Sequence, residues 1–363
     1  MNPTLNFQKG NISDLPIITD VLDRIQIAEL SLKNTKISKQ DWDAFETSWD
    51  FQRSPLLTNK ATTLQDAYNN WEYEALERFN QLKANEEELN RIFIDIYGLQ
   101  DELTPEEDDK DVTVRKADPV RDIKAFLSYF IGCVFGRYSL DVDGLAYAGG
   151  DWDPTKYQTF TPNEDNIILL TDRRVFNDQR DIIVRLREFL KVVFGADHLA
   201  DNLHFIAETL APQKIAKGTP VEQVIRDYFS KDFYKDHVQM YSKRPIYWQF
   251  SSGRSDGFKA LMYLHRYDHD ELAMARDYLH QLQEAYNTLI SFNAEQEKVA
   301  ATAKEKNNLS NDTKKLNKMI DEMIKYDAAL QHQALAQIDL DLDDGVVVNH
   351  AKLQGDEKLL TKF

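Results

Sequence analysis

The chain has 363 residues and a formal net charge of −17, with 61 Asp and Glu against 44 Lys and Arg. Affinity for DNA comes largely from neutralising phosphates with basic side chains, so this balance excludes a uniformly basic nucleic-acid-binding protein and restricts any DNA contact to a local basic patch. One cysteine excludes an internal disulfide framework, and no apolar run approaches the roughly 18 residues that a membrane span needs. We therefore expect a soluble protein of the reducing cytoplasm.

Residues 1–60 are predicted to form a linker with short helices. Thr19-Asp20 is a suitable cap for a first helix. Farther along, Trp42, Phe45 and Trp49 lie at helical spacing, and aromatics at this spacing usually pack a short helix onto a neighbour.

Residues 61–140 are predicted to form a long-helix region. From Thr63 to Tyr97, apolar residues recur every three or four positions, which predicts one long helix ended by Gly98. A second helix is expected from about Pro119 to Tyr138, because Asp118 suits the N-cap and proline suits the first helical position. Cys133 lies on its apolar face and is expected to be an inert core thiol.

Residues 141–268 are predicted to form a mixed α/β lobe. Its opening "LDVDGLAYAGGDWD" is rich in aspartate, which raises a calcium loop as an alternative, but the spacing of EF-hand ligands and the closing glutamate are absent. No metal site is expected there. Asn166–Asp172 predicts a short strand. Three helices are expected after it, at 177–194, at about 198–211 and from Thr219 to about 241.

The stretch "KRPIYWQFSSGRSDGFKALMYLHRYD" (Lys243–Asp268) changes to a period of two residues. Two alternating runs joined by "SSGRSDG" predict a β-hairpin at 245–264. One of its faces is apolar enough to belong to the core, and it carries Ile246, Trp248, Phe250, Phe258, Ala260 and Met262.

Residues 269–363 are predicted to form an antiparallel helical hairpin and a C-terminal tail. Its helices are expected at 270–306 and 312–338, separated by the polar break "KNNLSND", and "GVVVNH" in the tail could add one strand. The fold class is therefore mainly α: long helices and an antiparallel helical hairpin, with a small β-hairpin or sheet insertion as the minor component.

Basic side chains interleave with the aromatics of the β-hairpin, although the chain as a whole is acidic. They are placed at the entry, the turn, the face opposite the core and the exit, so that each can reach solvent. A β-ribbon with a basic tip can enter a DNA groove, and glycines at 253 and 257 would let the turn approach a phosphate. The DNA-binding candidates are Lys243, Arg244, Arg254, Lys259 and Arg266. The alternative is an ordinary solvated edge.

No catalytic pattern is visible in the sequence. Glycine-rich nucleotide loops, His or Cys clusters and a G-x-S-x-G serine are all absent. From the residues alone, this is a helical scaffold or interaction module that is not an enzyme and needs no cofactor.

The segment "LSYFIGCVFGRYSLDVDGLAYAGGDWD" (Leu127–Asp153) resembles a signature in the C-terminal part of the large adenine-specific DNA methyltransferases of BREX phage-exclusion systems, the PglX family. Related segments occur in single-chain restriction–modification enzymes. Three more stretches are similar to the same part of the family and follow in its order: "ELNRIFIDIYGLQDELTPE", the β-hairpin stretch and "DLDDGVVVNHAKLQ". The opening "NPTLNFQKGNISDLPI" looks like the linker that follows the methyltransferase core.

The resemblance implies a DNA-recognition and spacer region without the catalytic methyltransferase domain. The N/D-P-P-Y/F tetrapeptide is absent, and so is the glycine motif that binds S-adenosylmethionine, which is expected only in the missing half. Implied partners are double-stranded DNA, bound weakly by this chain alone, and the methyltransferase half or other phage-defence proteins. A membrane partner is not expected. The alternative function is an acidic helical protein-interaction scaffold with no DNA contact.

Overall fold

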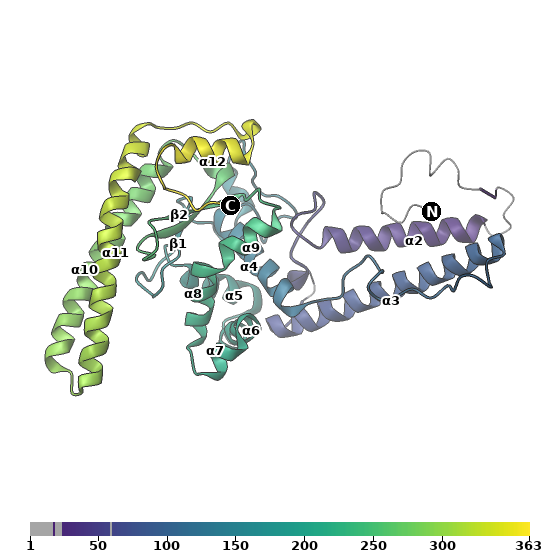
Figure 1. Cartoon of the computed structure of the whole chain (residues 1–363), viewed down its shortest axis with the longest axis horizontal. Helices are drawn as coiled ribbons and strands as arrows, with labels where there is room; N and C mark the ends of the chain where they lie inside the picture. Colours follow the sequence, from purple (N-terminus) through teal and green to yellow (C-terminus); the bar gives the residue numbers. More distant parts are fainter. Residues whose placement is uncertain (1–16, 19–23, 59) are drawn as a thin grey trace. The chain divides into compact units, whose positions relative to one another are not determined.

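The computed structural model describes residues 17–18, 24–58 and 60–363. Long helices dominate these residues and accompany one three-stranded sheet, which confirms the predicted fold class (Figure 1). No helix in the described ranges is long and apolar enough to cross a bilayer. The described chain groups into two compact units. One combines the residues up to Trp42 with Glu72–Ala117, and the other combines Asp43–Trp71 with Asp118–Phe363. The four-segment division made from the sequence stays a prediction.

The smaller unit is built on helix α2 (Arg24–Asp43) and most of helix α3 (Leu64–Tyr97). The two helices are joined by Asn85 Nδ2, which donates to Asn34 Oδ1 over 2.8 Å. Gly98 follows α3 with φ of 64°, as the sequence predicted. The apolar core of this unit is small and contains Phe79, Leu82, Val112 and Val114, with Ile37 packed against it. The predicted cap at Thr19–Asp20 lies outside the described residues.

The predicted packing of the early tryptophans is wrong. Helix α2 ends at Asp43 and the chain continues in turns, so the three aromatics do not share one helical face. Trp42 is 59% exposed and Trp49 is fully exposed. Phe45 alone is partly covered, by the guanidinium of Arg121 at 5.4 Å from its ring centre.

Helix α4 (Pro119–Phe135) forms the centre of the larger unit. Asp118 caps it by accepting from the Arg121 backbone N–H over 2.7 Å, and proline occupies the first position. Twelve of its 17 residues are buried, Cys133 among them, because apolar residues cover its whole circumference. It contacts α5 (Ile182–Phe194), α6 (Leu199–Leu210) and α9 (Phe233–Met240), and these helices in turn contact α7 (Pro212–Ala216) and α8 (Val221–Lys231). The single helix predicted from Thr219 is thus two helices, which meet at Asp232.

The sheet contains the predicted strand β1 (Ile167–Leu169) and the predicted hairpin of β2 (Tyr247–Ser251) and β3 (Lys259–Tyr263). The strands are antiparallel in the order β1-β3-β2. The C-terminal tail extends the sheet at the free edge of β2: Ser251 N donates to Leu359 O over 3.0 Å, and Thr361 N donates to Gln249 O over 2.8 Å.

The strand suggested for "GVVVNH" is wrong, because that segment begins helix α12 (Val346–Gln354). β-Branched residues favour strands only as a weak preference, which tertiary packing overrides. Here the helical period buries Asn349 and Leu353, four residues apart, while Val347 and Val348 stay exposed.

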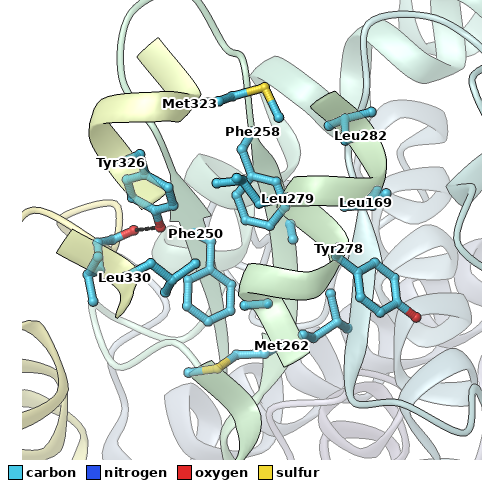
Figure 2. Packing of buried hydrophobic residues seen from close by; sticks show 14 of the residues in the cluster. Leu169, Phe250, Phe258, Met262, Tyr278, Leu279, Leu282, Met323, Tyr326 and Leu330 are labelled. Atoms are coloured by element: carbon cyan, nitrogen blue, oxygen red, sulfur yellow. Dashed lines mark hydrogen bonds between the residues drawn. The ribbon is translucent and has the colours of Figure 1, made fainter. Parts of the chain in front are cut away.

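One face of the sheet packs against helices α10 (Glu271–Val299) and α11 (Ala303–Leu335), which form the predicted antiparallel hairpin (Figures 1 and 2). The shared core includes Trp248, Phe250, Phe258, Met262, Leu279, Leu282, Met323 and Leu330. The hydroxyl of Tyr326, which Figure 2 labels, donates to the Leu359 carbonyl over 2.7 Å and so ties α11 to the tail.

The turn between α10 and α11 lies at 300–302, so the predicted break at "KNNLSND" is wrong. Thr302 begins α11 with a capping box: its hydroxyl accepts from Glu305 N, and the Glu305 carboxylate accepts from Thr302 N. The polar residues 306–312 therefore lie inside α11, where the cap and the long packed helix override their weak helix propensity.

Leu282 is fully buried in the core shared with α11. Replacing it by aspartate puts an unpaired carboxylate into that core, so Leu282→Asp should lower the free energy of unfolding by roughly 3–5 kcal/mol. Urea denaturation followed by circular dichroism measures the change. Leu335→Asp is the matched control, since Leu335 is an exposed leucine of α11 and its replacement should cost under about 1 kcal/mol. Equal unfolding midpoints for Leu282→Asp and the wild type would contradict this packing.

Candidate nucleic-acid interface

The structure separates the five predicted DNA-binding residues. Lys243 and Arg244 lie exposed in the turn between α9 and β2, and Arg254 lies exposed in the turn between β2 and β3. The five residues of β2 span about 17 Å, so these two turns are at opposite ends of the hairpin. Across the described residues, no hydrogen bond or ion pair holds the charged ends of these three side chains, which leaves them available to a ligand.

The expectation that all five bases reach solvent is wrong for Lys259, whose side chain is only 13% exposed. Its ammonium group binds Asp256 Oδ1 at 2.7 Å and donates to the Ser230 carbonyl over 2.9 Å. The side chain opposite the apolar face is therefore enclosed by protein, because helices cover both faces of the sheet.

Arg266 is likewise held by the protein. Its guanidinium donates to the carbonyls of Phe135, Asn163 and Glu164 over 2.9–3.1 Å and lies 4.5 Å from the ring centre of Trp152. Burial lowers the pKa of this guanidinium from its usual value. Arg266 joins the C-terminal end of α4 to the loop that precedes β1, so it stabilises the fold.

The tip of the β-hairpin is docked on α11. The carboxylate of Glu322 accepts from Ser252 Oγ and from the backbone N–H of Ser255, both over 2.7 Å, and from the N–H of Gly257 over 3.2 Å. A Cβ atom at Gly257 would lie 2.5 Å from the Met319 carbonyl oxygen, so only glycine fits at this position. The close approach expected between this glycine and a phosphate is made to α11 instead.

The signature segment folds into α4 and the loop that follows it. Gly136 ends the helix with φ of 77°, and a Cβ at this position would lie 2.4 Å from Trp152, whose ring stacks on Tyr157 with centres 4.8 Å apart. Three of the four aspartates of this loop have partners within the protein, and Asp143 forms an ion pair with Arg53. Asp141 accepts from Gln158 N and Thr159 N, and Asp153 accepts from Thr155 N. These hydrogen bonds hold the loop in its conformation, so these aspartates have a structural role.

A buried polar cluster lies between α4, α9 and the sheet. Arg137 donates to the Tyr263 hydroxyl over 3.1 Å, and that hydroxyl donates to the Tyr147 carbonyl over 3.0 Å. His237 Nε2 accepts from the backbone N–H groups of Ile246 and Tyr247. Burial and the nearby Arg137 charge lower the pKa of His237 to about 3, so this imidazole is neutral at pH 7. Our sequence analysis missed this cluster, although an arginine inside the apolar run "VFGRY" was its visible signal.

Glu46 is a buried carboxylate near this cluster. It accepts from Ser128 Oγ, and its Oε2 atom has no hydrogen-bond partner among the described residues. Burial raises the pKa of Glu46 to about 6, although the Ser128 hydroxyl and the Arg137 charge act in the opposite direction.

Because folding raises the pKa of Glu46, the folded protein holds the proton of this carboxyl more tightly than the unfolded chain does. The contribution of Glu46 to stability is therefore complete below about pH 4.5 and is lost as the pH rises through about 6. Glu46→Gln should remove this loss and gain about 2 kcal/mol relative to the wild type between pH 4 and pH 7.5. Urea denaturation at both pH values measures the gain. Glu297→Gln, which changes an exposed carboxylate of α10, is the control and should not increase stability. If the stability difference between Glu46→Gln and the wild type were the same at both pH values, the raised pKa of Glu46 would be contradicted.

The Glu322 contacts predict a second effect on stability. Glu322→Ala leaves the N–H groups of Ser255 and Gly257 without their acceptor and should cost about 1–3 kcal/mol. Thermal denaturation measures the loss, and hydrogen exchange should show it first at the hairpin turn. Asp321→Ala is the matched control, because that neighbouring carboxylate is exposed. Equal losses for both variants would mean that the hairpin tip is not held by Glu322.

Comparison with known proteins identifies relatives of the chain. No family model matches it. It is 54% identical over 368 residues to the adenine-specific methyltransferase PglX of Lacticaseibacillus casei (strain Zhang), an alignment that covers 99% of this chain and 30% of that protein. It is also 35% identical over 392 residues to the adenine-specific methyltransferase BrxX of Escherichia coli O9:H4 (strain HS), covering 99% of this chain and 32% of that protein. The chain thus spans about a third of the length of the curated relatives it matches.

These alignments confirm the resemblance seen in the sequence motifs. The alignments cover 30% and 32% of the two relatives, which is consistent with the C-terminal part that the motifs implied. The chain is homologous, over nearly its whole length, to a segment of the adenine-specific methyltransferases PglX and BrxX.

Proposed function

We propose that this chain is the DNA-recognition and spacer region of an adenine-specific DNA methyltransferase from a BREX-like phage-defence or restriction–modification system. The observation that carries the proposal is the alignment of 99% of the chain with about a third of two adenine-specific methyltransferases. The catalytic tetrapeptide and the cofactor-binding glycine motif do not occur in this sequence. Methyl transfer from S-adenosylmethionine then belongs to the part of such an enzyme with which this chain does not align.

Adenine methylation explains why such a region is needed. The target base has to leave the helix stack before it can enter a catalytic pocket, and this costs unstacking energy. A second lobe that holds the duplex fixes the position of the flipped base. In the larger unit, helices α10 and α11 are packed on the sheet along a continuous apolar core, so this part of the chain is suited to act as a spacer of constant length.

Among the five predicted basic residues, we assign DNA contact to Lys243, Arg244 and Arg254. Their charged groups are exposed, and no described residue competes for them. Lys259 and Arg266 would first have to leave Ser230, Asp256 and the carbonyls near α4, so we assign them to support of the fold.

The alternative function is an acidic interaction scaffold that binds a protein partner and no DNA. The net charge of −17 favours it, because a strongly acidic chain repels phosphates over much of its surface. Binding to duplex DNA separates the two functions.

The chain should shift a duplex in an electrophoretic mobility assay at low salt, with a dissociation constant that rises steeply with salt. Replacing both Lys243 and Arg244 by alanine should reduce the slope of log K against log salt by roughly two units, since each lost phosphate contact removes about 0.9. Titration of target and random duplexes at several salt concentrations measures the slope.

Lys259→Met is the control variant for this titration. It removes a charge that is already bound inside the protein, so it should change stability and leave the slope as it is. The chain alone should neither bind S-adenosylmethionine in calorimetry nor methylate DNA, and fusion to a PglX-like catalytic half should be required for methylation. Stoichiometric cofactor binding by the chain alone would refute this division of roles.

A further inference from the structure

Helix α11 carries six lysines and five acidic residues, but the acids are mostly occupied by contacts within the protein. Four of the five carboxylates have such contacts: Glu305 in the capping box, Asp312 with Arg173 and Asn293, Glu322 with the β-hairpin, and Asp327 with Arg276 and His280. Only Asp321 is exposed without a hydrogen bond or ion pair to the described part of the chain. Among the described residues, five lysines of α11 and three of its carboxylates (Glu305, Asp321 and Glu322) have no partner of opposite charge, so the charge that remains on the helix is positive.

Four of the lysines of α11 lie on one side of the helix. At 3.6 residues per turn, Lys304, Lys314, Lys318 and Lys325 fall within about 40° of a single line along the helix. All four are exposed, and none has a hydrogen bond or ion pair with a described residue. Asn307 and Asn311 lie on the same line and are exposed, and we call these six residues the α11 basic stripe. Glu322 also falls on this line, but it is less exposed and its carboxylate accepts hydrogen bonds from the β-hairpin.

The length of the stripe matches a feature of DNA. From residue 304 to residue 325 the helix rises about 32 Å at 1.5 Å per residue. One turn of B-form DNA is about 34 Å long. Lysine and asparagine side chains are common donors to phosphate oxygens, and such contacts position a protein on a duplex without reading its sequence.

The tip of the β-hairpin adds a further cation to this stripe. Glu322 lies on α11 between Lys318 and Lys325, and it binds the backbone N–H of Ser255. Arg254, the residue before Ser255, is exposed at this contact. The hairpin therefore supplies neutral hydrogen-bond donors to this carboxylate and brings in a guanidinium.

Helix α10 has the opposite charge on its solvent side. Its exposed acidic residues are Asp277, Glu284, Glu295 and Glu297. A duplex that approaches the helical hairpin is repelled by α10 and attracted by α11, so this charge asymmetry defines the side on which a phosphate backbone can bind.

We propose that the α11 basic stripe, together with Arg254, binds the phosphate backbone of double-stranded DNA along about one helical turn. This inference rests on the proposed function and adds the location of the backbone contact. The stripe holds the duplex in position, and sequence is read elsewhere.

The test is a salt titration of a random 30-base-pair duplex with the 363-residue chain. In the stripe variant, Lys304, Lys314, Lys318 and Lys325 are all changed to glutamine, which keeps a high helix propensity. In the matched control, four exposed lysines away from the stripe are changed to glutamine: Lys217, Lys235, Lys306 and Lys352. Both variants have the same net charge, and circular dichroism confirms that each is folded.

The stripe variant should lose about three units of slope in log K against log salt, and Arg254→Ala alone about one unit. The control variant should stay within one unit of the wild type. Equal losses in both variants would overturn the proposal, because they would show an effect of overall charge. Unchanged binding by the stripe variant would also overturn it, while the Lys243 and Arg244 contacts and the proposed function could still hold. A wild-type chain that binds no duplex at low salt, and binds an acidic protein instead, would reject both.

Discussion

The three-stranded sheet is buried on both faces, and the arrangement of the larger unit depends on this burial. Along β2, Trp248 and Phe250 point to α10 and α11, whereas Tyr247 points to α4, with its ring centre 5.5 Å from that of Phe135. The strands have only three or five residues, so the sheet depends on packing against helices to bury enough apolar surface. Two sets of helices, one on each face, supply the missing burial and are in turn held in place by it.

The two faces of the sheet differ in chemistry. The face toward α10 and α11 is almost purely apolar, which lets the helical hairpin pack by the hydrophobic effect. The face toward α4 contains Arg137, Tyr263 and His237 with their hydrogen bonds. Buried polar groups are costly unless they are paired, so this second interface needs specific geometry and gives the signature segment its defined position.

The burial of the sheet on both faces also determines which charged side chains remain available to contact a ligand. An overall charge of −17 describes the composition, but a ligand meets only side chains whose charges are not already bound within the protein. Among the described residues, five of the six lysines of α11 have no ion-pair partner, whereas Asp312 and Asp327 are paired with arginines, so one side of this helix is basic in an acidic chain. A DNA-binding role is compatible with an acidic chain on this basis. Physiological salt screens exposed charges beyond about 8 Å, so a phosphate responds mainly to the charges near it.

The sequence by itself determined the long helices, the strand–hairpin set and the family resemblance. Helical periods, the Asp118-Pro119 start and Gly98 are local signals, and the chain obeys them because each concerns groups a few residues apart. The alternation around "SSGRSDG" similarly predicted β2 and β3.

Tertiary structure alone decided which of the predicted basic residues remain free. Arg266 binds a carbonyl 131 residues earlier in the chain, and Ser255 binds a carboxylate 67 residues later. Contacts over such distances leave no periodic pattern in the sequence. For the same reason, the helix at Val346–Gln354 escaped local reasoning. The start of α11 at Ala303 is different, because the Thr302–Glu305 capping box is a local signal that the prediction overlooked. Propensity and spacing describe what a segment can form, and the packing of remote segments determines which of its side chains still face water.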